Sequence, residues 1–194
     1  MSDEVIAKLD ALARMSSEEL QRALPGTLEE ICTFGAGRLL EARPDALLTI
    51  IKALLAGKSA RVFSTTPAAA ETFMRILWEG VEARSADAPE LQAALNKTDR
   101  EMHVNIEASD SPLAGHFHIT PAGIAGGAGL VHFRDQDYCY MGPTDILLRF
   151  LSGELHMGAY NLELQTAGHS GFATRAGLVL RGITALLRKL NKDA

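Results

Sequence analysis

The chain is organised around the segment Tyr138-Cys139-Tyr140-Met141-Gly142-Pro143-Thr144-Asp145-Ile146-Leu147-Leu148-Arg149-Phe150-Leu151-Ser152-Gly153. This segment predicts a strand, a sharp turn and a helix of about two turns. Tyrosines favour strands, and Gly142-Pro143 breaks the strand. Thr144 or Asp145 is expected to cap the helix by accepting a hydrogen bond from its first free amides. Gly153 can adopt the left-handed conformation that ends a helix.

A long amphipathic helix is predicted after this stretch. Its apolar side chains recur at alternating three- and four-residue steps, which places them on one stripe of a helix. The stripe consists of Phe172, Ala176, Val179, Ile183, Leu186 and Leu190. The cations Arg188 and Lys189 suit the carboxyl end of such a helix. The stripe is expected to pack on a sheet.

Upstream of Tyr138 the apolar pattern has a period of two, which is typical of strands with one buried and one wet face. Residues 102–108 and 114–120 alternate in this way, and residues 130–133 are expected to form a further strand. Short polar turns between these segments indicate a meander of antiparallel strands. The glycine cluster 126–129 lacks the spacing and the following helix of a nucleotide-binding loop, so a tight turn or bulge is expected there.

The first third of the chain is predicted to be helical. Ser16 and Thr27 each precede a glutamate by three residues, and both pairs read as capping boxes that mark helix starts. Pro25-Gly26 is expected to break the helix between them. Pro44 is expected at the first position of a later helix, while residues 61–63 are compatible with a short strand or a loop.

The helix predicted over residues 46–56 is apolar nearly all round, so it is expected to be buried on most sides. Three roles stay open for it: a central packing helix, a dimer interface, or a lid over an apolar cavity. Trp78, the single tryptophan, lies on the next long helix. It is expected to anchor the core or to form a wall of a ligand cavity.

Composition excludes several classes of protein. The 194 residues are 47% hydrophobic and 22% charged, which is typical of a globular chain. A net charge of -5 argues against a nucleic-acid partner. No apolar run is long enough to cross a bilayer, and the acidic N-terminus lacks a signal core, so a cytoplasmic protein is expected. Cys32 and Cys139 are expected to be small buried hydrophobes.

No catalytic signature is recognisable: there is no nucleophile elbow, Ser-His-Asp order, CxxC or pair of catalytic carboxylates. The residues with obvious chemistry are His103, His116, His118 and His132, which are expected on the polar face of the strands. Several imidazoles on one sheet face can hold a divalent metal such as zinc. A metal-dependent enzyme is therefore one alternative, and solvated histidines without a metal are the other.

The order strand, turn, helix ending in Gly, Gly-closed strand and final helix resembles the sterol carrier protein type-2 family, the sterol-binding/transfer domain. The resemblance covers roughly residues 68–190. The matching segments are Phe73-Met74-Arg75-Ile76-Leu77, Pro89-Glu90-Leu91, Thr144-Asp145-Ile146-Leu147, Leu151-Ser152-Gly153-Glu154-Leu155, Leu162-Glu163-Leu164 with Gly168, and Ala176 to Leu190. One departure is Gly168-His169, where the family often has Gly-Asp.

Pattern and resemblance together predict an α+β fold. A twisted, mostly antiparallel sheet of about five strands is covered by helices on one face, and an N-terminal helical extension packs against it. The expected organisation is an N-terminal helical segment over residues 1–65 and a sterol-carrier-like lipid-binding domain over residues 66–194.

The resemblance implies non-catalytic binding or carrying of a hydrophobic ligand in an apolar tunnel, without a cofactor. A fatty-acyl, isoprenoid or sterol-like lipid would fit this description, and small residues such as Ala173, Ala176 and Gly177 would leave room for it. The candidate lining is Trp78, Phe117, Ile119, Phe133, Tyr140, Phe150, Leu151, Phe172, Ala176 and Val179. A further alternative is an accessory protein that forms a homodimer through its N-terminal helices and docks a partner enzyme.

Overall fold

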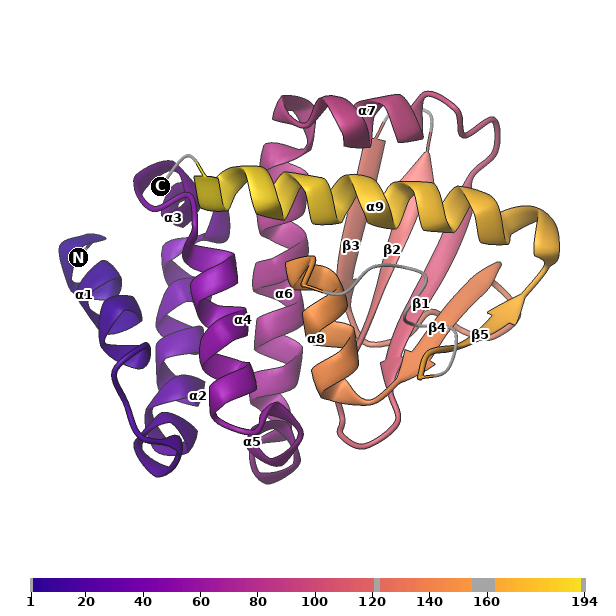
Figure 1. Cartoon of the computed structure of the whole chain (residues 1–194). Coiled ribbons are helices and arrows are strands. Elements are labelled where there is room, and N and C mark those ends of the chain that lie inside the picture. Colours follow the sequence, from indigo (N-terminus) through magenta and orange to yellow (C-terminus); the bar gives the residue numbers. More distant parts are fainter. Residues whose placement is uncertain (1, 121–122, 155–162, 193–194) are drawn as a thin grey trace.

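The computed structural model describes residues 2–120, 123–154 and 163–192 of the chain. Its fold is α+β, with a five-stranded sheet in the order β3-β2-β1-β4-β5. Helices from the first part of the chain lie to one side of the strands, and α9 crosses the sheet (Figure 1). The predicted fold class is confirmed. Leu155 and Leu162 of the family resemblance, and the predicted turn at Pro121-Ala122, lie outside the described residues.

β1 and β2 each have one apolar face and one more polar face. The bounds of the strands are β1 Met102–Ala108, β2 Ala114–Thr120, β3 Gly123–Ala128, β4 Tyr138–Gly142 and β5 Gln165–Gly168. In β1, Met102, Val104 and Ile106 are buried and alternate with the half-buried His103. The period of two therefore gives the predicted bounds of β1 and β2, because it follows directly from the pleat of a strand.

The prediction of a simple antiparallel meander is wrong for β4. The pairs β1–β2, β2–β3 and β4–β5 are antiparallel, but β4 lies on the other side of β1 and runs parallel to it. The segment 129–137, here called the crossing loop, makes this change of position. Asn105 of β1 holds the loop, since its side-chain amide donates to the Val131 carbonyl (3.1 Å) and its side-chain oxygen accepts from the Val131 amide (3.0 Å). Residues 130–133 thus lie in a loop and not in the predicted strand.

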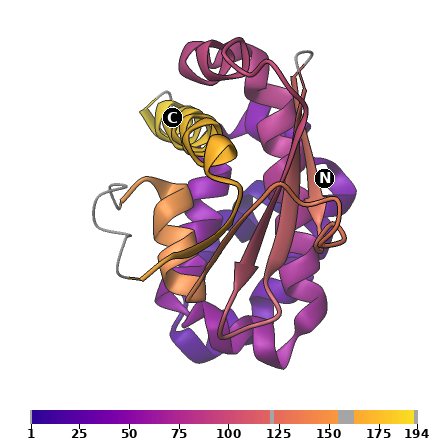
Figure 2. The ribbon, with the colours of Figure 1, turned by 90° about the vertical axis from the view of Figure 1, so that its right-hand side faces the viewer.

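The helices cover the apolar face of the sheet, so the expectation of helices on one face is confirmed. In Figure 2 the sheet separates α7, α8 and α9 from the crossing loop, which lies on the other side. The helix bounds are α1 Ser2–Leu12, α2 Ser17–Phe34, α3 Ala36–Ala42, α4 Ala46–Ala56, α5 Ser59–Thr65, α6 Pro67–Arg84, η1 Ser85–Asp87, α7 Pro89–Leu95, α8 Thr144–Ser152 and α9 Ser170–Lys192.

One predicted helix start in the first third of the chain is confirmed and the other is wrong. Ser16 and Glu19 form the expected capping box at the start of α2. However, α2 continues through Pro25, and the Thr27 hydroxyl donates to the Ala23 carbonyl within the helix (3.1 Å) instead of capping a new one. Buried leucines before and after Pro25 hold the helix in place by tertiary packing, which outweighs the hydrogen bond that proline removes.

The apolar helix α4 is a packing helix within the chain. Leu47, Ile50, Ile51 and Leu54 are at most 1% exposed in a single copy of the protein. Of the three roles left open by the sequence, central packing is confirmed. Pro44 lies two residues before α4, not at its first position.

Residues 61–63, compatible with a strand or a loop by sequence, belong to the helix α5. Val62 and Phe63 are fully buried, and the Phe63 ring lies 6.0 Å from that of Phe73 on α6. These contacts bury the apolar side chains of a segment whose local sequence is too short to show a period.

The glycine cluster serves close packing between a helix and the sheet. Gly126 lies in the regular strand β3, opposite Phe117, and not in the expected turn or bulge. A Cβ added at Gly126 would lie 2.5 Å from the Trp78 indole of α6. On β2, a Cβ at Gly115 would lie 2.0 Å from the Met74 methyl group. Glycine is required here because only a strand surface without side chains admits the indole.

The start of α8 is capped from outside the helix, so the prediction that Thr144 or Asp145 caps it is wrong. Asp110, in the turn between β1 and β2, accepts hydrogen bonds from the Thr144 amide (2.8 Å) and hydroxyl (2.6 Å). Asp145 instead accepts a hydrogen bond from the Ser59 hydroxyl of α5. The helix ends as predicted, with Gly153 in the left-handed conformation (φ 76°).

Replacement of Asp110 tests this remote cap. Asp110→Ala is expected to lower the free energy of unfolding by about 0.5–2 kcal/mol, the usual cost of a lost N-terminal cap. Denaturant unfolding followed by circular dichroism measures the change. Asp135→Ala, at an exposed position of the crossing loop, is the matched control. Equal stability of the two variants would show that Asp110 does not stabilise α8.

Candidate ligand-binding pocket

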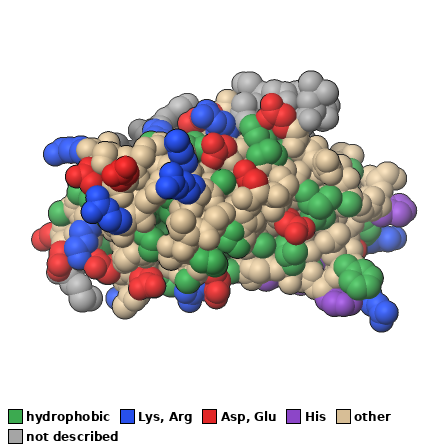
Figure 3. Space-filling view, turned by 90° about the horizontal axis from the view of Figure 1, so that it is seen from below, with side chains coloured by type: hydrophobic (Ala, Val, Ile, Leu, Met, Phe, Trp, Pro, Cys, Tyr) green, Lys and Arg blue, Asp and Glu red, His purple; other side chains and the backbone are tan. Residues whose placement is uncertain are grey.

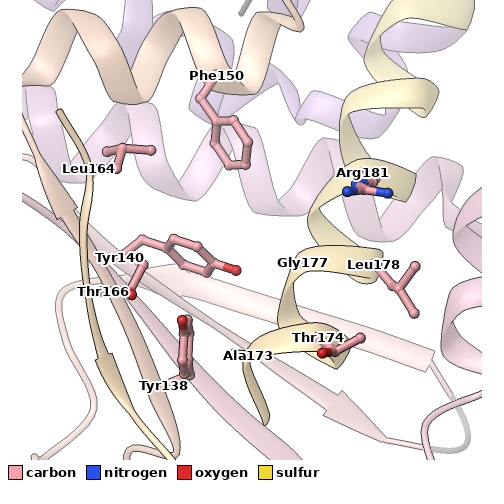
Figure 4. Close-up of a pocket in the computed structure, with 10 residues that line it drawn as sticks. All are labelled: Tyr138, Tyr140, Phe150, Leu164, Thr166, Ala173, Thr174, Gly177, Leu178 and Arg181. Carbon is pink, nitrogen blue, oxygen red and sulfur yellow. The ribbon is translucent and has the colours of Figure 1, made fainter. Parts of the chain in front are cut away.

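A pocket of about 400 Å³ lies between the C-terminal strands and helices. It is enclosed by β4 and β5 on one side and by α8 and α9 on the other (Figure 4). Its lining is Tyr138, Tyr140, Phe150, Leu164, Thr166, Ala173, Thr174, Gly177, Leu178 and Arg181. The volume is within the range of small-molecule sites.

Strand alternation places both tyrosines in the pocket. Tyr138 and Tyr140 are two residues apart on β4, in register with Val104 and Ile106, so they share the apolar face of the sheet. Their rings meet edge to face at 5.2 Å, and the ring of Tyr140 lies 6.3 Å from that of Phe150 on α8. The strand side of the pocket is therefore a continuous aromatic surface.

The opposite wall is one face of α9. The residues of this wall follow one another at alternating steps of one and three residues, next to the buried stripe of the same helix: Ala173, Thr174, Gly177, Leu178 and Arg181. Because Ala173 and Gly177 have little or no side chain, the surface of α9 does not project into the pocket at this point. The space between α9 and β4 stays open because these positions have little volume with which to fill it.

Burial shapes the acid–base behaviour of β4. Burial raises the pKa of Tyr140, and the neighbouring Tyr138 adds to the rise. Tyr140 therefore keeps its proton and presents a neutral hydroxyl. Cys139 points to the other face of the strand, where burial first and Glu107 second raise the pKa of its thiol to about 11. Cys139 is buried as expected, whereas Cys32 is half-buried.

The structure distributes the predicted lining residues over three environments. Tyr140 and Phe150 lie in the pocket wall. Buried core contains Trp78, Phe117, Ile119, Leu151, Ala176 and Val179, each at most 1% exposed. Phe172 is half-buried, and Phe133 is 71% exposed on the crossing loop. A role of any of these residues in binding stays a prediction.

Most of the pocket lining lies outside the residues predicted from the sequence. The small residues Ala173 and Gly177 were expected to leave room for a ligand, and both line the pocket. The lining residues that were not predicted are Tyr138, Leu164, Thr166, Thr174, Leu178 and Arg181. The available signal was positional: Tyr138 shares a strand face with Tyr140, and Arg181 follows Gly177 by one helical turn. The predicted lining consisted mainly of large apolar residues, and such residues fill the core where two elements pack closely.

The histidines lie on the polar face of the sheet or beyond it. His103 and His118 stack with ring centroids 4.1 Å apart, and His116 Nδ1 lies 2.9 Å from the Gly129 carbonyl oxygen. His132 is on the crossing loop beside Phe133, so its predicted place on a strand is wrong. Figure 3 shows histidines at the sheet end of the molecule, near exposed hydrophobic and basic side chains.

A metal site is not assembled by these residues. Within the described parts of the chain, no group of three or more His, Cys, Asp or Glu side chains is placed to hold a metal ion. His118 Nε2 lies 3.7 Å from Glu101, and the His103 ring stacks on that of His118. The Asp137 carboxylate accepts from the backbone amide of His103 (2.9 Å). None of the helices in the described ranges is both long enough and apolar enough to cross a membrane.

Comparisons with known proteins give one kind of match. A search against protein-family models found none that matches, and a search of curated proteins also found none. Among solved structures, the apo form of sterol carrier protein 2 from Yarrowia lipolytica is similar to this chain, with 10% sequence identity and a TM-score of 0.40. The match covers 59% of this chain and 91% of the sterol carrier protein. These values do not place the chain in that family, so membership stays a prediction.

Proposed function

We propose that this protein binds and carries a hydrophobic small molecule in the pocket between β4, β5, α8 and α9, without catalysing a reaction. The observation that carries the proposal is the aromatic and aliphatic pocket of about 400 Å³ in which Tyr140 and Phe150 face the surface of α9. Mostly apolar walls with few polar groups are typical of ligand sites.

Burial of apolar surface would supply the binding energy. Removing apolar area from water contributes roughly 25 cal/mol per Å². A long-chain or ring-shaped lipid buries several hundred Å² when its apolar part is enclosed, which is enough for a Kd on the order of micromolar after the cost of association. A fatty-acyl chain, an isoprenoid or a sterol-like molecule would each meet this requirement.

We further propose that residues 66–194 form the ligand-binding domain and that residues 1–65 support it. All residues that line the pocket lie between Tyr138 and Arg181. Within the N-terminal segment, α4 and α5 contact α8, and the Ser59 hydroxyl donates to Asp145 at the start of α8. The N-terminal helices would thus hold α8, one wall of the pocket, in place.

Filling the pocket from α9 tests the proposal. Gly177→Leu is expected to weaken binding of an apolar fluorescent probe by about tenfold or more, because the leucine side chain would occupy ligand space. Titration of the probe, followed by displacement with fatty acids or terpenoids, measures the change. Leucine also has a higher helix propensity than glycine, so α9 is expected to stay helical.

Gly26→Leu is the matched control, because Gly26 lies inside the helix α2 and a Cβ there meets no atom within 4 Å. This variant is expected to bind the probe like the unmodified protein. Ala173→Leu, on the same wall of the pocket as Gly177, provides a second test at a half-buried site. Wild-type affinity in both pocket variants, or no binding of any long-chain ligand, would contradict the proposal.

A further inference from the structure

Two tyrosine hydroxyls of β4 point into the pocket. Tyr138 is 7% exposed and Tyr140 6% exposed. In Figure 4 the Tyr140 hydroxyl points across the pocket toward α9, and the Tyr138 hydroxyl points toward Tyr140. Neither hydroxyl has a hydrogen-bond partner within residues 2–120, 123–154 and 163–192. A ligand in the pocket can therefore accept hydrogen bonds from both hydroxyls.

One positively charged side chain lies at the edge of the same pocket. Arg181 lies on α9 one turn beyond Gly177, is exposed, and is the charged residue of the lining. In the part of the chain that the structure describes, Arg181 has no ion pair, whereas Arg175 on the same helix pairs with Asp99 at 2.7 Å. Among the described residues, the lining contains no aspartate or glutamate. An unpaired guanidinium in an otherwise acidic protein attracts an anion.

We propose that Tyr138, Tyr140 and Arg181 bind the head group of an amphiphile with a single carboxylate, such as a long-chain fatty acid, while the aromatic and aliphatic walls hold its tail. This inference rests on the proposed function of the pocket and names its ligand class. The phenols donate hydrogen bonds to the carboxylate oxygens, and the guanidinium neutralises the charge.

Charge balance favours a carboxylate over a phosphate ester. The described lining residues offer one positive charge, which matches the single negative charge of a carboxylate. A phosphate monoester carries up to two negative charges at neutral pH, so part of its charge would stay unpaired beside apolar walls, where this is costly. The net charge of -5 for the whole chain adds to that cost.

The experiment compares three ligands with the same tail: hexadecanoate, hexadecanol and hexadecyl phosphate. We expect the unmodified protein to bind hexadecanoate about tenfold or more tightly than hexadecanol, because a charge-assisted hydrogen bond contributes about that factor. Hexadecyl phosphate is expected to bind less tightly than hexadecanoate. Competition with an apolar fluorescent probe, below the micellar concentration of each ligand, gives all three affinities.

Variants then assign the effect to the three residues. Arg181→Gln is expected to lower the affinity for hexadecanoate by about tenfold and to leave the affinity for hexadecanol unchanged, because the substitution removes the positive charge. Arg175→Gln, outside the pocket on the same helix, is the matched control and should change neither affinity. Tyr138→Phe and Tyr140→Phe each remove one hydroxyl and keep the ring. Each variant is expected to bind hexadecanoate several-fold less tightly.

The outcomes separate this inference from the proposed function. If hexadecanoate and hexadecanol bind equally, or if Arg181→Gln leaves their ratio unchanged, the carboxylate site is refuted while the hydrophobic pocket still stands. Tighter binding of hexadecyl phosphate than of hexadecanoate would also refute it, in favour of a phosphate head group. If none of the three ligands displaces the probe, the proposed function itself fails.

Discussion

An Ile51→Asp variant is expected to lose more than about 4 kcal/mol of unfolding free energy and to melt much earlier than the unmodified protein. Ile51 is fully buried in α4. The substitution removes a buried aliphatic side chain, which by itself costs about 2–5 kcal/mol. It also places a carboxyl group in an apolar site, where the group must either desolvate its charge or take up a proton. Thermal and denaturant unfolding measure the loss.

Lys52→Asp is the control for this variant. Lys52 follows Ile51 directly on α4 but is exposed, so the new carboxylate there stays in water. Its effect on stability is expected to be small, within about 0.5 kcal/mol. An Ile51→Asp protein that stays folded while its mass in solution falls from dimer to monomer would mean that α4 forms an interface between copies. Unchanged melting would mean that α4 is not packed at all.

Trp78→Ala is expected to destabilise the protein by about 3–5 kcal/mol, the range for removal of a large buried aromatic side chain. Trp78 is 1% exposed, and its ring lies 5.1 Å from that of Phe117 on β2. Its indole nitrogen has no hydrogen-bond partner among the described residues. Trp78→Phe therefore loses ring volume but no hydrogen bond, and it is expected to cost clearly less. Chemical denaturation followed by far-ultraviolet circular dichroism compares the two.

A double-mutant cycle connects Trp78 with the strand that it covers. Gly126→Val is expected to destabilise the protein by about 1–3 kcal/mol, because its Cβ would lie 2.5 Å from an indole carbon of Trp78. In the Trp78→Ala background the same change is expected to cost less by about 1 kcal/mol or more. Gly127→Val, which faces the His116 ring on the other side of β3, is the control without such coupling. Additive effects at Trp78 and Gly126 would contradict this packing.

Elements with a local sequence pattern were predictable without the structure. The period of two in residues 102–108 and 114–120 predicted β1 and β2 to the residue, because alternation of side chains is a property of each strand alone. The apolar stripe predicted α9. Gly153 predicted the end of α8, since a left-handed backbone conformation limits the choice of residue at one position.

Features that depend on contacts between distant residues were not predictable from the sequence. Buried leucines carry α2 through Pro25, and the cap of α8 comes from Asp110, which lies 34 residues before Thr144. Asn105 fixes the crossing loop and with it the parallel position of β4. Local patterns of hydrophobicity cannot show such contacts, because they identify the apolar face of an element but not the partner that covers it.

The pocket shows this limit most clearly. Large apolar residues such as Phe117 and Val179 were natural candidates for a ligand site, yet they fill the core where helices and sheet touch. The open space lies where Ala173 and Gly177 keep α9 away from Tyr140. A cavity exists where apolar faces fail to meet, and the distance between two faces depends on the volumes of side chains from several elements at once. The sequence therefore contained the lining residues, but only the packing of β4, β5, α8 and α9 together decided which side chains face an open space.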